Sequence, residues 1–382
     1  MRVALVHDWL TGMRGGEKVL EELCHLYPDA PLFTLLHVPG SVSSVIESRR
    51  IVSTGLTRIP GIARHYRRFL PLFPRLIESL DLTGFELVVS TSSCVAKGAR
   101  AAAGARHVSY VHSPMRYVWD RYHDYFGAGR AGPLTRGAMA VFREPLRRWD
   151  RRTADRVDRY LANSAFVARR IRDCYDRDAT VVPPPVDAEH FRPTGDGPGD
   201  EWLVVSAFVP YKRIEVAVEA AAIAGVPLAI VGKGPEEARL RELAGPRVRF
   251  LGWVDDRELV RLYSSCRGLL FPGVEDFGIT PLEAMACGRP VVAFAEGGAL
   301  ETVVGALWEG DPDGAARAAT GLFVREQTPR AFARAILALE RTPELVSPVD
   351  CRDRALEFGR PRFRERLRSI LTSEGEASIL PG

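Results

Sequence analysis

The feature that most constrains the fold is a regular alternation of short apolar runs with helical patterns, interrupted once by prolines. Such alternation is typical of parallel α/β architecture. The interruption falls at residues 181–187, where Pro183, Pro184 and Pro185 can continue neither a helix nor a central strand. A chain of 382 residues is also long for one core and suits about two domains. We therefore predict two doubly wound Rossmann-like domains, residues 1–185 and 186–350.

Six apolar runs on each side of the proline break are the strand candidates. Several are nearly unbroken runs of branched residues, which suits strands buried on both faces. Before the break they are Val3–Asp8, Leu32–Leu36, Ile51–Thr54, Leu87–Thr91, His107–His112 and Tyr160–Asn163, and after it Trp202–Ala207, Leu228–Gly232, Val248–Leu251, Leu269–Phe271, Val291–Phe294 and Leu322–Val324. Residues 351–382 are expected to form a C-terminal helix packed on the N-terminal domain, with a frayed tail after Leu371.

Composition excludes several classes of protein. Hydrophobic residues make up 46% and charged residues 26% of the chain, which is typical of soluble globular proteins. No apolar run approaches the roughly 20 residues of a membrane span, and His7 and Asp8 interrupt the first apolar stretch too early for a secretory signal. The 6 cysteines include no CxxC pair, which argues against a zinc site or a disulfide framework and favours a cytoplasmic location.

Two basic stretches leave a membrane question open. Four arginines (Arg64, Arg67, Arg68, Arg75) interleave with aromatic and aliphatic residues, and a second stretch occupies residues 143–152. These stretches are compatible either with peripheral contact at an anionic membrane surface or with a solvated helix face over a core. Pro71 and Pro74 break any long helix in the first stretch. Nucleic-acid binding is disfavoured, because the net charge is only +4 and no recognised motif occurs.

The first candidate ligand contact is a glycine-rich turn after the first strand. Gly15 and Gly16 lead into a helix expected to begin near Glu17. The free N–H groups and positive dipole end of such a helix suit an anionic ligand. The turn lacks the GxGxxG fingerprint, which disfavours nicotinamide or flavin binding. A plain tight turn is the alternative interpretation.

A second candidate is His112, which follows another predicted strand. Ligands of doubly wound sheets gather beyond the carboxyl ends of the strands. His112 could there donate a hydrogen bond to a sugar hydroxyl or a phosphate. A purely structural hydrogen-bonding role is the alternative.

The most informative segment is residues 271–286, FPGVEDFGITPLEAMA. Glu275 lies on a loop after a strand, and Glu283 lies eight positions later inside a helix whose first turn accommodates Pro281. Carboxylates accept hydrogen bonds from paired hydroxyls, as in a hexose or a ribose. Glu283 interrupts an apolar surround, and a buried carboxylate needs partners.

The spacing of Glu275 and Glu283 within EDFGITPLEAMACGRPVVAF resembles the donor-binding motif of retaining glycosyltransferase family four. Other segments are similar to that family in the same order: Gly15-Gly16, HSPMRYVWD from His112, Tyr211-Lys212-Arg213, IVGKGP at 230–235, FLGWV at 250–254 and EGGALETV at 296–303. The resemblance covers roughly residues 1–340. The HSPMRYVWD and EDFGITPLEA segments are most similar to bacterial O-antigen and exopolysaccharide mannosyltransferases.

The resemblance implies a GT-B fold, with an acceptor-side domain and a nucleotide-sugar-binding domain facing a central cleft. It implies catalytic roles for His112, Glu275 and Lys212. The implied donor-binding residues are Gly15, Gly16, Lys212 and Arg213 at the diphosphate, Glu275 and the backbone of Asp276, Phe277, Gly278 and Ile279 at the hexose, Glu283 at the ribose, and Gly252, Trp253 and Val254 near the base. One departure is Ala207, where many members carry an arginine whose charge Arg213 is expected to supply.

The implied reaction transfers a hexose, with mannose from GDP-mannose favoured, to a hydroxyl of a glycan or lipid-linked acceptor. We expect front-face attack with the leaving phosphate accepting the acceptor's proton; Glu275 as a nucleophile is the less favoured route. We expect no resident cofactor and no metal, and interpret Asp311-Pro312-Asp313 as a turn. The alternatives are a UDP-sugar-dependent enzyme acting on a small molecule, a nucleotide-sugar epimerase and a non-catalytic scaffold.

Overall fold

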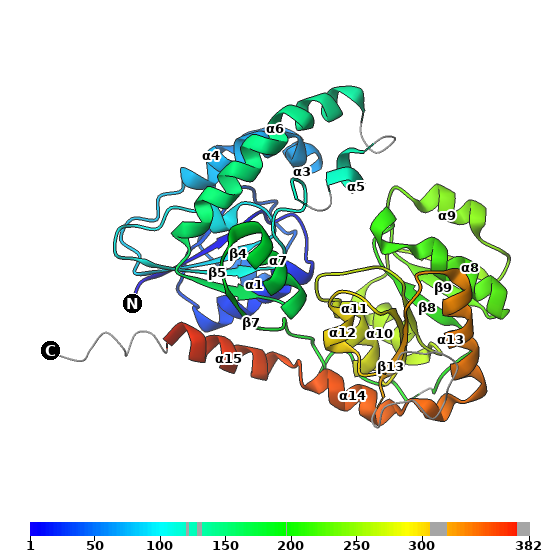
Figure 1. Cartoon of the computed structure of the whole chain (residues 1–382). Helices are drawn as coiled ribbons and strands as arrows, with labels where there is room; N and C mark the ends of the chain where they lie inside the picture. The colour runs from blue at the N-terminus through cyan, green and yellow to red at the C-terminus, as the bar shows by residue number, and fades with distance from the viewer. Residues whose placement is uncertain (120–121, 128–131, 196, 306–318, 373–382) are drawn as a thin grey trace. The chain divides into compact units, whose positions relative to one another are not determined.

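A computed structural model describes residues 1–119, 122–127, 132–195, 197–305 and 319–372, and the chain divides into two compact units (Figure 1). The first unit contains residues 1–185 together with the chain from Phe363 onward, and the second contains residues 186–362. Each unit is a parallel α/β sheet with its own buried core, so the predicted fold class is correct.

The first unit is built on a seven-stranded parallel sheet in the order β3-β2-β1-β4-β5-β6-β7. Its strands are β1 (Val3–His7), β2 (Leu32–Thr34), β3 (Ile51–Ser53), β4 (Leu87–Ser92), β5 (Arg106–Val111), β6 (Arg159–Ala162) and β7 (Ala179–Val181). Six of these correspond to the predicted runs. The seventh, β7, was missed because it has only three residues and runs directly into the proline break.

Helices cover both faces of this sheet. They are α1 (Gly15–Leu26), α2 (Ser44–Glu47), α3 (Ile62–His65), α4 (Phe73–Glu78), α5 (Tyr122–Phe126), α6 (Pro133–Arg152), α7 (Ala165–Tyr175) and α15 (Arg360–Thr372), with short 3-10 helices η1 (Gly55–Arg58), η2 (Tyr66–Leu72), η3 (Ala96–Gly98) and η4 (Thr153–Arg156). One buried cluster joins α1 and α15 to the sheet, and another joins η2, α4 and α6 to the opposite face. As Pro71 and Pro74 predict, residues 62–78 form short helices rather than one long one.

The second unit contains a six-stranded parallel sheet in the order β10-β9-β8-β11-β12-β13. Its strands are β8 (Trp202–Val205), β9 (Leu228–Val231), β10 (Val248–Gly252), β11 (Leu269–Phe271), β12 (Val291–Phe294) and β13 (Gly321–Val324), and its helices are α8 (Ile214–Ala224), α9 (Glu237–Leu243), α10 (Asp256–Ser265), α11 (Ile279–Ala286), α12 (Ala299–Thr302), α13 (Pro329–Arg341) and α14 (Pro348–Leu356), with η5 (Pro210–Lys212) and η7 (Pro343–Leu345). All six strands fall on the predicted runs.

The C-terminal segment is divided differently from the prediction. The second unit does not end at residue 350: α14 packs against α11, and Arg352 donates a 2.6 Å hydrogen bond to the Ala286 carbonyl. The next helix, α15, places Phe363, Leu367 and Leu371 in the core of the first unit, because a spacing of four puts them on one helix face. Arg364 on the same helix pairs with buried Glu22 of α1.

Both sheets reverse their strand order at one place, between β1 and β4 in the first unit and between β8 and β11 in the second. In doubly wound sheets, ligands bind in the crevice outside the carboxyl ends of the strands at this switch point. The loops that follow these four strands are therefore the first place to look for a site. Among the described residues, no helix is long and apolar enough to cross a membrane.

Candidate functional site

The loop after β11 carries Glu275 and leads into α11. Gly278 precedes the helix with φ +83°, and a Cβ there would lie 3.0 Å from the Phe271 ring. A residue with a side chain would be strained and crowded in this position, so glycine is required to turn the loop into the helix. Pro281 lies in the first turn, as predicted.

Gly297 and Gly298 of the EGGALETV segment pack against the backbone of this loop. A Cβ on Gly297 would lie 2.5 Å from the Glu275 carbonyl oxygen, and one on Gly298 would lie 2.3 Å from Cα of Phe277. The Gly298 amide also donates a 2.9 Å hydrogen bond to the Glu275 carbonyl. The glycines thus let two backbones approach closely enough to fix the position of Glu275.

Lys212 and Glu275 come together in the structure. A Cβ on Gly273 would lie 2.8 Å from Cα of Lys212, so this glycine permits η5 to pack directly on the loop after β11. The Lys212 ammonium forms an ion pair with the Glu275 carboxylate, and the two side chains are only 14% and 23% exposed. Two of the three predicted catalytic residues are therefore neighbours at the switch point of the second sheet.

The rest of the loop offers mainly backbone. Phe277 is buried, with its ring centroid 5.9 Å from that of Phe358, so its side chain belongs to the core. Asp276 and Ile279 are partly exposed. The contact of the backbone after Glu275 with the hexose stays a prediction.

The Arg213 guanidinium has two side-chain partners in the second unit. Its guanidinium donates 2.7 Å hydrogen bonds to Glu215 and to Gln327, whose own amide donates to the Pro272 carbonyl at 2.8 Å. Arg213 therefore braces the loop after β11. To reach a diphosphate in place of the charge missing at exposed Ala207, it would have to exchange these partners.

Glu283 is buried on α11 at 4% exposure and accepts a 3.0 Å hydrogen bond from the Tyr263 hydroxyl. Burial and the neighbouring Glu283 carboxylate raise the pKa of Tyr263 well above its ordinary value, so the phenol stays a donor. Sequence reasoning did not identify Tyr263, because nothing in its local pattern distinguishes it from a core tyrosine.

The predicted base-binding segment follows the neighbouring strand. Gly252 has φ +69°, and its carbonyl accepts a 2.7 Å hydrogen bond from Gly232 of the IVGKGP segment. This contact joins the ends of β9 and β10. Trp253 is 74% exposed and Val254 is half-buried, so the indole is accessible for stacking.

In the first unit, the N-terminus of α1 meets His112. A Cβ on Gly16 would lie 3.4 Å from Nε2 of His112 and 3.7 Å from the His7 ring. Space around Gly15 is open. The helix begins at Gly15 rather than near Glu17, because the Glu17 carboxylate accepts a 3.0 Å hydrogen bond from the Arg14 amide and caps the helix.

Beside Gly16 lies His7, which was not predicted as a site residue. Nδ1 of His7 is 2.5 Å from the Thr91 hydroxyl, and its Nε2 is 3.6 Å from the Glu17 carboxylate. Burial raises the pKa of Glu17, but hydrogen bonding to His7 and its charge outweigh burial, and the pKa falls below its ordinary value.

Asp8, the next residue, organises the loop after β4. Its buried carboxylate accepts hydrogen bonds of 2.6–2.9 Å from four successive backbone amides, those of Ser93, Cys94, Val95 and Ala96. The His7-Asp8 pair at the end of the first buried strand was the available sequence signal, since polar residues seldom end such a run without a role.

Among the described residues, no group of three histidine, cysteine or acidic side chains is placed to hold a metal ion. The Asp311-Pro312-Asp313 segment lies outside the described residues. Metal independence remains a prediction.

Comparison with known families was informative over almost the whole chain. A family model described as Glycosyltransferase Family 4 matches residues 13–190, and one described as Glycosyl transferases group 1 matches residues 187–355. The boundary between the two matches falls close to that between the structural units.

Two relatives illustrate the sequence similarity. The O-antigen chain mannosyltransferase C of Escherichia coli is 38% identical over 112 residues, which cover 27% of this chain and 29% of that protein. The D-inositol 3-phosphate glycosyltransferase of Geodermatophilus obscurus is 32% identical over 257 residues, which cover 58% of this chain and 53% of that protein. The matches thus span about a third to a half of the relatives' own length.

Solved structures agree on the fold. The sucrose-phosphate synthase of Thermosynechococcus elongatus has a TM-score of 0.71 at 20% identity, covering 99% of this chain and 100% of that one. HepE of Anabaena in complex with UDP has a TM-score of 0.70 at 17% identity, covering 98% and 100%. At these identities the similarity establishes the GT-B architecture of two Rossmann-like domains.

Proposed function

Because this chain belongs to glycosyltransferase family four, we propose that it is a retaining hexosyltransferase that moves mannose from GDP-mannose to a hydroxyl of a lipid-linked glycan. The observation that carries the proposal is the Lys212–Glu275 ion pair on a loop that four glycines help to shape. A half-buried cation beside a carboxylate, at the switch point of a Rossmann-like sheet, suits a sugar diphosphate.

In the proposed reaction, the bond between the anomeric carbon and the diphosphate oxygen breaks, and the acceptor oxygen bonds to the same face of that carbon. The departing phosphate takes the proton from the acceptor hydroxyl. Lys212 stabilises the negative charge that develops on the leaving group. Glu275 and the following backbone amides hold the hexose hydroxyls.

Glu283 is proposed to hold the ribose. Its buried carboxylate is oriented by the Tyr263 hydroxyl at 3.0 Å. A ribose offers two adjacent hydroxyls, which a fixed carboxylate accepts in a bidentate manner. Trp253 provides an exposed indole for the base.

The similarity to the O-antigen chain mannosyltransferase supports mannose as the transferred sugar and a glycan as the acceptor. A second candidate acceptor is a small phosphorylated polyol, because a D-inositol 3-phosphate glycosyltransferase matches more than half of this chain. Both candidates share the donor site and the chemistry, and they differ only in the acceptor.

The first test is calorimetric titration of the full chain with GDP, UDP, ADP and dTDP in the presence of EDTA. Selective GDP binding at micromolar strength is expected, and selective UDP binding would contradict GDP-mannose as the donor. Incubation of the chain with GDP-mannose and extracted polyprenyl-linked glycan, or with inositol phosphate, then identifies the acceptor class. Nuclear magnetic resonance of the product shows whether the anomeric configuration is retained.

A product that forms from the donor without any acceptor would favour an epimerase. If no nucleotide bound, the missing arginine at Ala207 would be the first explanation to examine. In that case the variant Ala207→Arg should restore binding, since the position is exposed and tolerates a longer side chain.

A further inference from the structure

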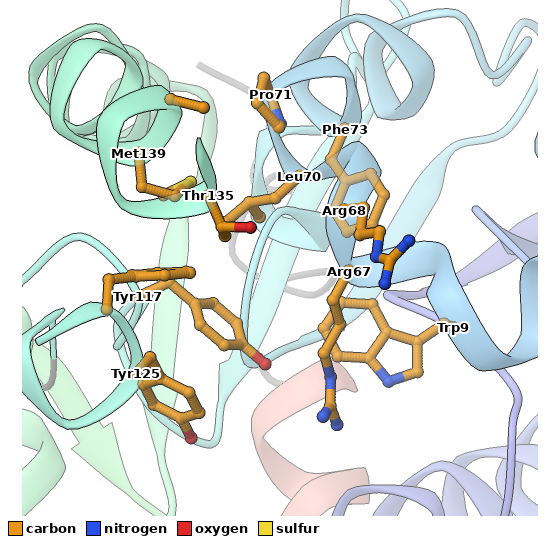
Figure 2. Close-up of a pocket in the computed structure, with 12 residues that line it drawn as sticks. Trp9, Arg67, Arg68, Leu70, Pro71, Phe73, Tyr117, Tyr125, Thr135 and Met139 are labelled. Atoms are coloured by element: carbon orange, nitrogen blue, oxygen red, sulfur yellow. The ribbon is translucent and has the colours of Figure 1, made fainter. Parts of the chain in front are cut away.

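The first unit contains a cavity of about 340 Å³ that none of the predicted site residues lines. Its walls come from the end of β1, from η2 and α4, from the segment after β5 and from α6 (Figure 2). Most of the lining is aromatic or aliphatic, including Trp9, Leu70, Phe73, Tyr117 and Met139. An apolar cavity of this size fits a hydrocarbon chain better than a sugar, which needs a polar partner for each hydroxyl.

The aromatic walls are rigidly packed against one another. The Trp9 ring lies 5.2 Å from that of Tyr66 and 6.1 Å from that of Phe73, and the Tyr117 and Tyr125 rings are 4.8 Å apart. These contacts make the cavity a preformed feature of the unit rather than a gap that side chains could close.

Two cations border the apolar lining. Arg67 and Arg68 both contribute to the cavity wall, and Figure 2 shows the Arg67 guanidinium at the same end as the Tyr117 and Tyr125 hydroxyls. Within the described part of the chain, no carboxylate lies within ion-pair distance of Arg67 or Arg68. The titratable groups that face Arg67 most closely are the neutral phenols of Tyr66, Tyr117 and Tyr125. An unneutralised pair of guanidinium groups beside an apolar cavity is complementary to a phosphate joined to an apolar chain.

The cavity lies next to the strand ends that carry the candidate site of the first unit. Trp9 follows His7 and Asp8 at the end of β1, and Tyr117 lies five residues after His112 at the end of β5. A molecule held in the cavity would therefore have its phosphate close to the edge of the sheet at which the acceptor is expected.

The same face of α6 continues onto the surface. Thr135, Ala138 and Met139 line the cavity, and Phe142, the next residue on that helix face, is 41% exposed. Leu72, directly after the cavity residue Pro71, is 48% exposed. Exposed apolar side chains on both walls would allow a lipid chain to pass from a bilayer into the cavity.

We propose that this cavity receives the lipid part of the acceptor, an apolar chain whose phosphate is held by Arg67 and Arg68. The inference rests on the proposed function, because only a transferase requires an acceptor at this edge of the sheet. It selects a phosphate-linked lipid over the small phosphorylated polyol, which would leave the apolar walls in contact with water.

The test is flotation of the full chain with two kinds of phosphatidylcholine vesicle. One contains a polyprenyl phosphate, and the other contains phosphatidylglycerol in the amount that gives the same negative charge. The variant Ala138→Trp fills the cavity from an exposed helix position, and Ala140→Trp on the opposite side of α6 is its matched control. A second pair removes two charges each: R67Q/R68Q at the cavity, and R64Q/R75Q in the same segment outside it. Circular dichroism and GDP titration of every variant report on folding and on the second unit.

The wild type and both controls should prefer the polyprenyl phosphate vesicles by about tenfold, the value expected for burial of only two methylene groups. Ala138→Trp and R67Q/R68Q should lose that preference while binding GDP normally. Equal binding of the wild type to both vesicles, or an unchanged preference in Ala138→Trp, would overturn the lipid assignment. If the wild type did not bind GDP, that result would contradict the proposed function, whatever the vesicle experiment showed.

Discussion

The Lys212 ammonium is paired with the Glu275 carboxylate, and the close packing of Gly273 on Lys212 holds the two side chains together. Glu275 thus neutralises the cation proposed to bind the diphosphate. The two residues are therefore expected to respond differently to mutation, although they form one ion pair.

Replacement of Lys212 by Met removes the cation and should weaken GDP binding by about tenfold or more, because charge-assisted hydrogen bonds to phosphate contribute roughly 1.5–3 kcal/mol. Glu275→Gln keeps the shape of the side chain and frees Lys212. It should leave GDP affinity unchanged or tighter while turnover falls about a hundredfold. Calorimetry and steady-state kinetics separate the two effects. Equal weakening of GDP binding by both variants would reduce the pair to a structural contact.

Glu283 is expected to recognise the ribose, and the Tyr263 hydroxyl to orient it. Glu283→Ala should weaken GDP binding by at least about tenfold, a loss typical of hydrogen bonds to a charged acceptor. The same variant should bind 2′,3′-dideoxy-GDP as well as the wild type does, since that ligand lacks the hydroxyls in question. Tyr263→Phe is the milder control and should cost only a few-fold in GDP affinity. Unchanged GDP affinity in Glu283→Ala would refute the ribose assignment.

Gly298 is expected to tolerate no side chain. A Cβ there would lie 2.3 Å from Cα of Phe277, so Gly298→Ala has to displace the loop that carries Glu275. Turnover should fall by about a hundredfold or more, the cost of a displacement on the order of 1 Å at a reacting centre. Gly245→Ala, where a Cβ would meet no atom within 4 Å, should leave turnover unchanged. Both variants can be compared by thermal melting and by kinetics at saturating donor.

Most strands of the fold could be predicted because buried parallel strands produce unbroken apolar runs, as in Leu87–Val89. The three-residue β7 has no such run, and its residues are only half-buried. The C-terminal segment was predicted in part. A helix packed on the first unit was expected and is α15, but the boundary at residue 350 was wrong, because the packing of α14 on α11 depends on contacts distant in sequence.

The candidate site shows the same limit. The family resemblance assigns roles to Glu275, Glu283 and Lys212 that stay predictions, and the structure pairs Lys212 with Glu275. The partners that orient such residues, Tyr263 for Glu283 and Gln327 for Arg213, lie 20 and 114 positions away and carry no motif of their own. Which side chains position others depends on tertiary contacts, so a single sequence does not reveal them.

His107 should make the protein acid-sensitive well above the range of ordinary carboxylates. Its ring is fully buried on β5 beside Ser90, and burial lowers its pKa from 6.5 to about 4. Between these pH values the unfolded chain binds a proton that the folded chain does not, so stability is complete above pH 6.5 and decreases as pH falls towards 4. The total loss should be about 3 kcal/mol. Urea unfolding at several pH values measures it, and His107→Gln, which does not titrate, should show a flatter dependence over this interval.

The two adjacent glycines at the start of α1 should behave differently, although their sequence context is almost the same. Alanine at either position raises helix propensity, by up to about 1 kcal/mol. A Cβ at Gly15 meets open space, whereas one at Gly16 lies 3.4 Å from Nε2 of His112 and 3.7 Å from the His7 ring. Gly15→Ala should therefore be as active as the wild type and slightly more stable. Gly16→Ala should be as stable as Gly15→Ala, but its turnover should be about tenfold lower. The added methyl shifts His112 and occupies the space through which a phosphate would reach the helix N-terminus. Melting curves and turnover measured on both variants test this difference. Equal turnover of the two variants would make Gly16 a simple turn residue and would remove the main support for a ligand at this end of the first sheet.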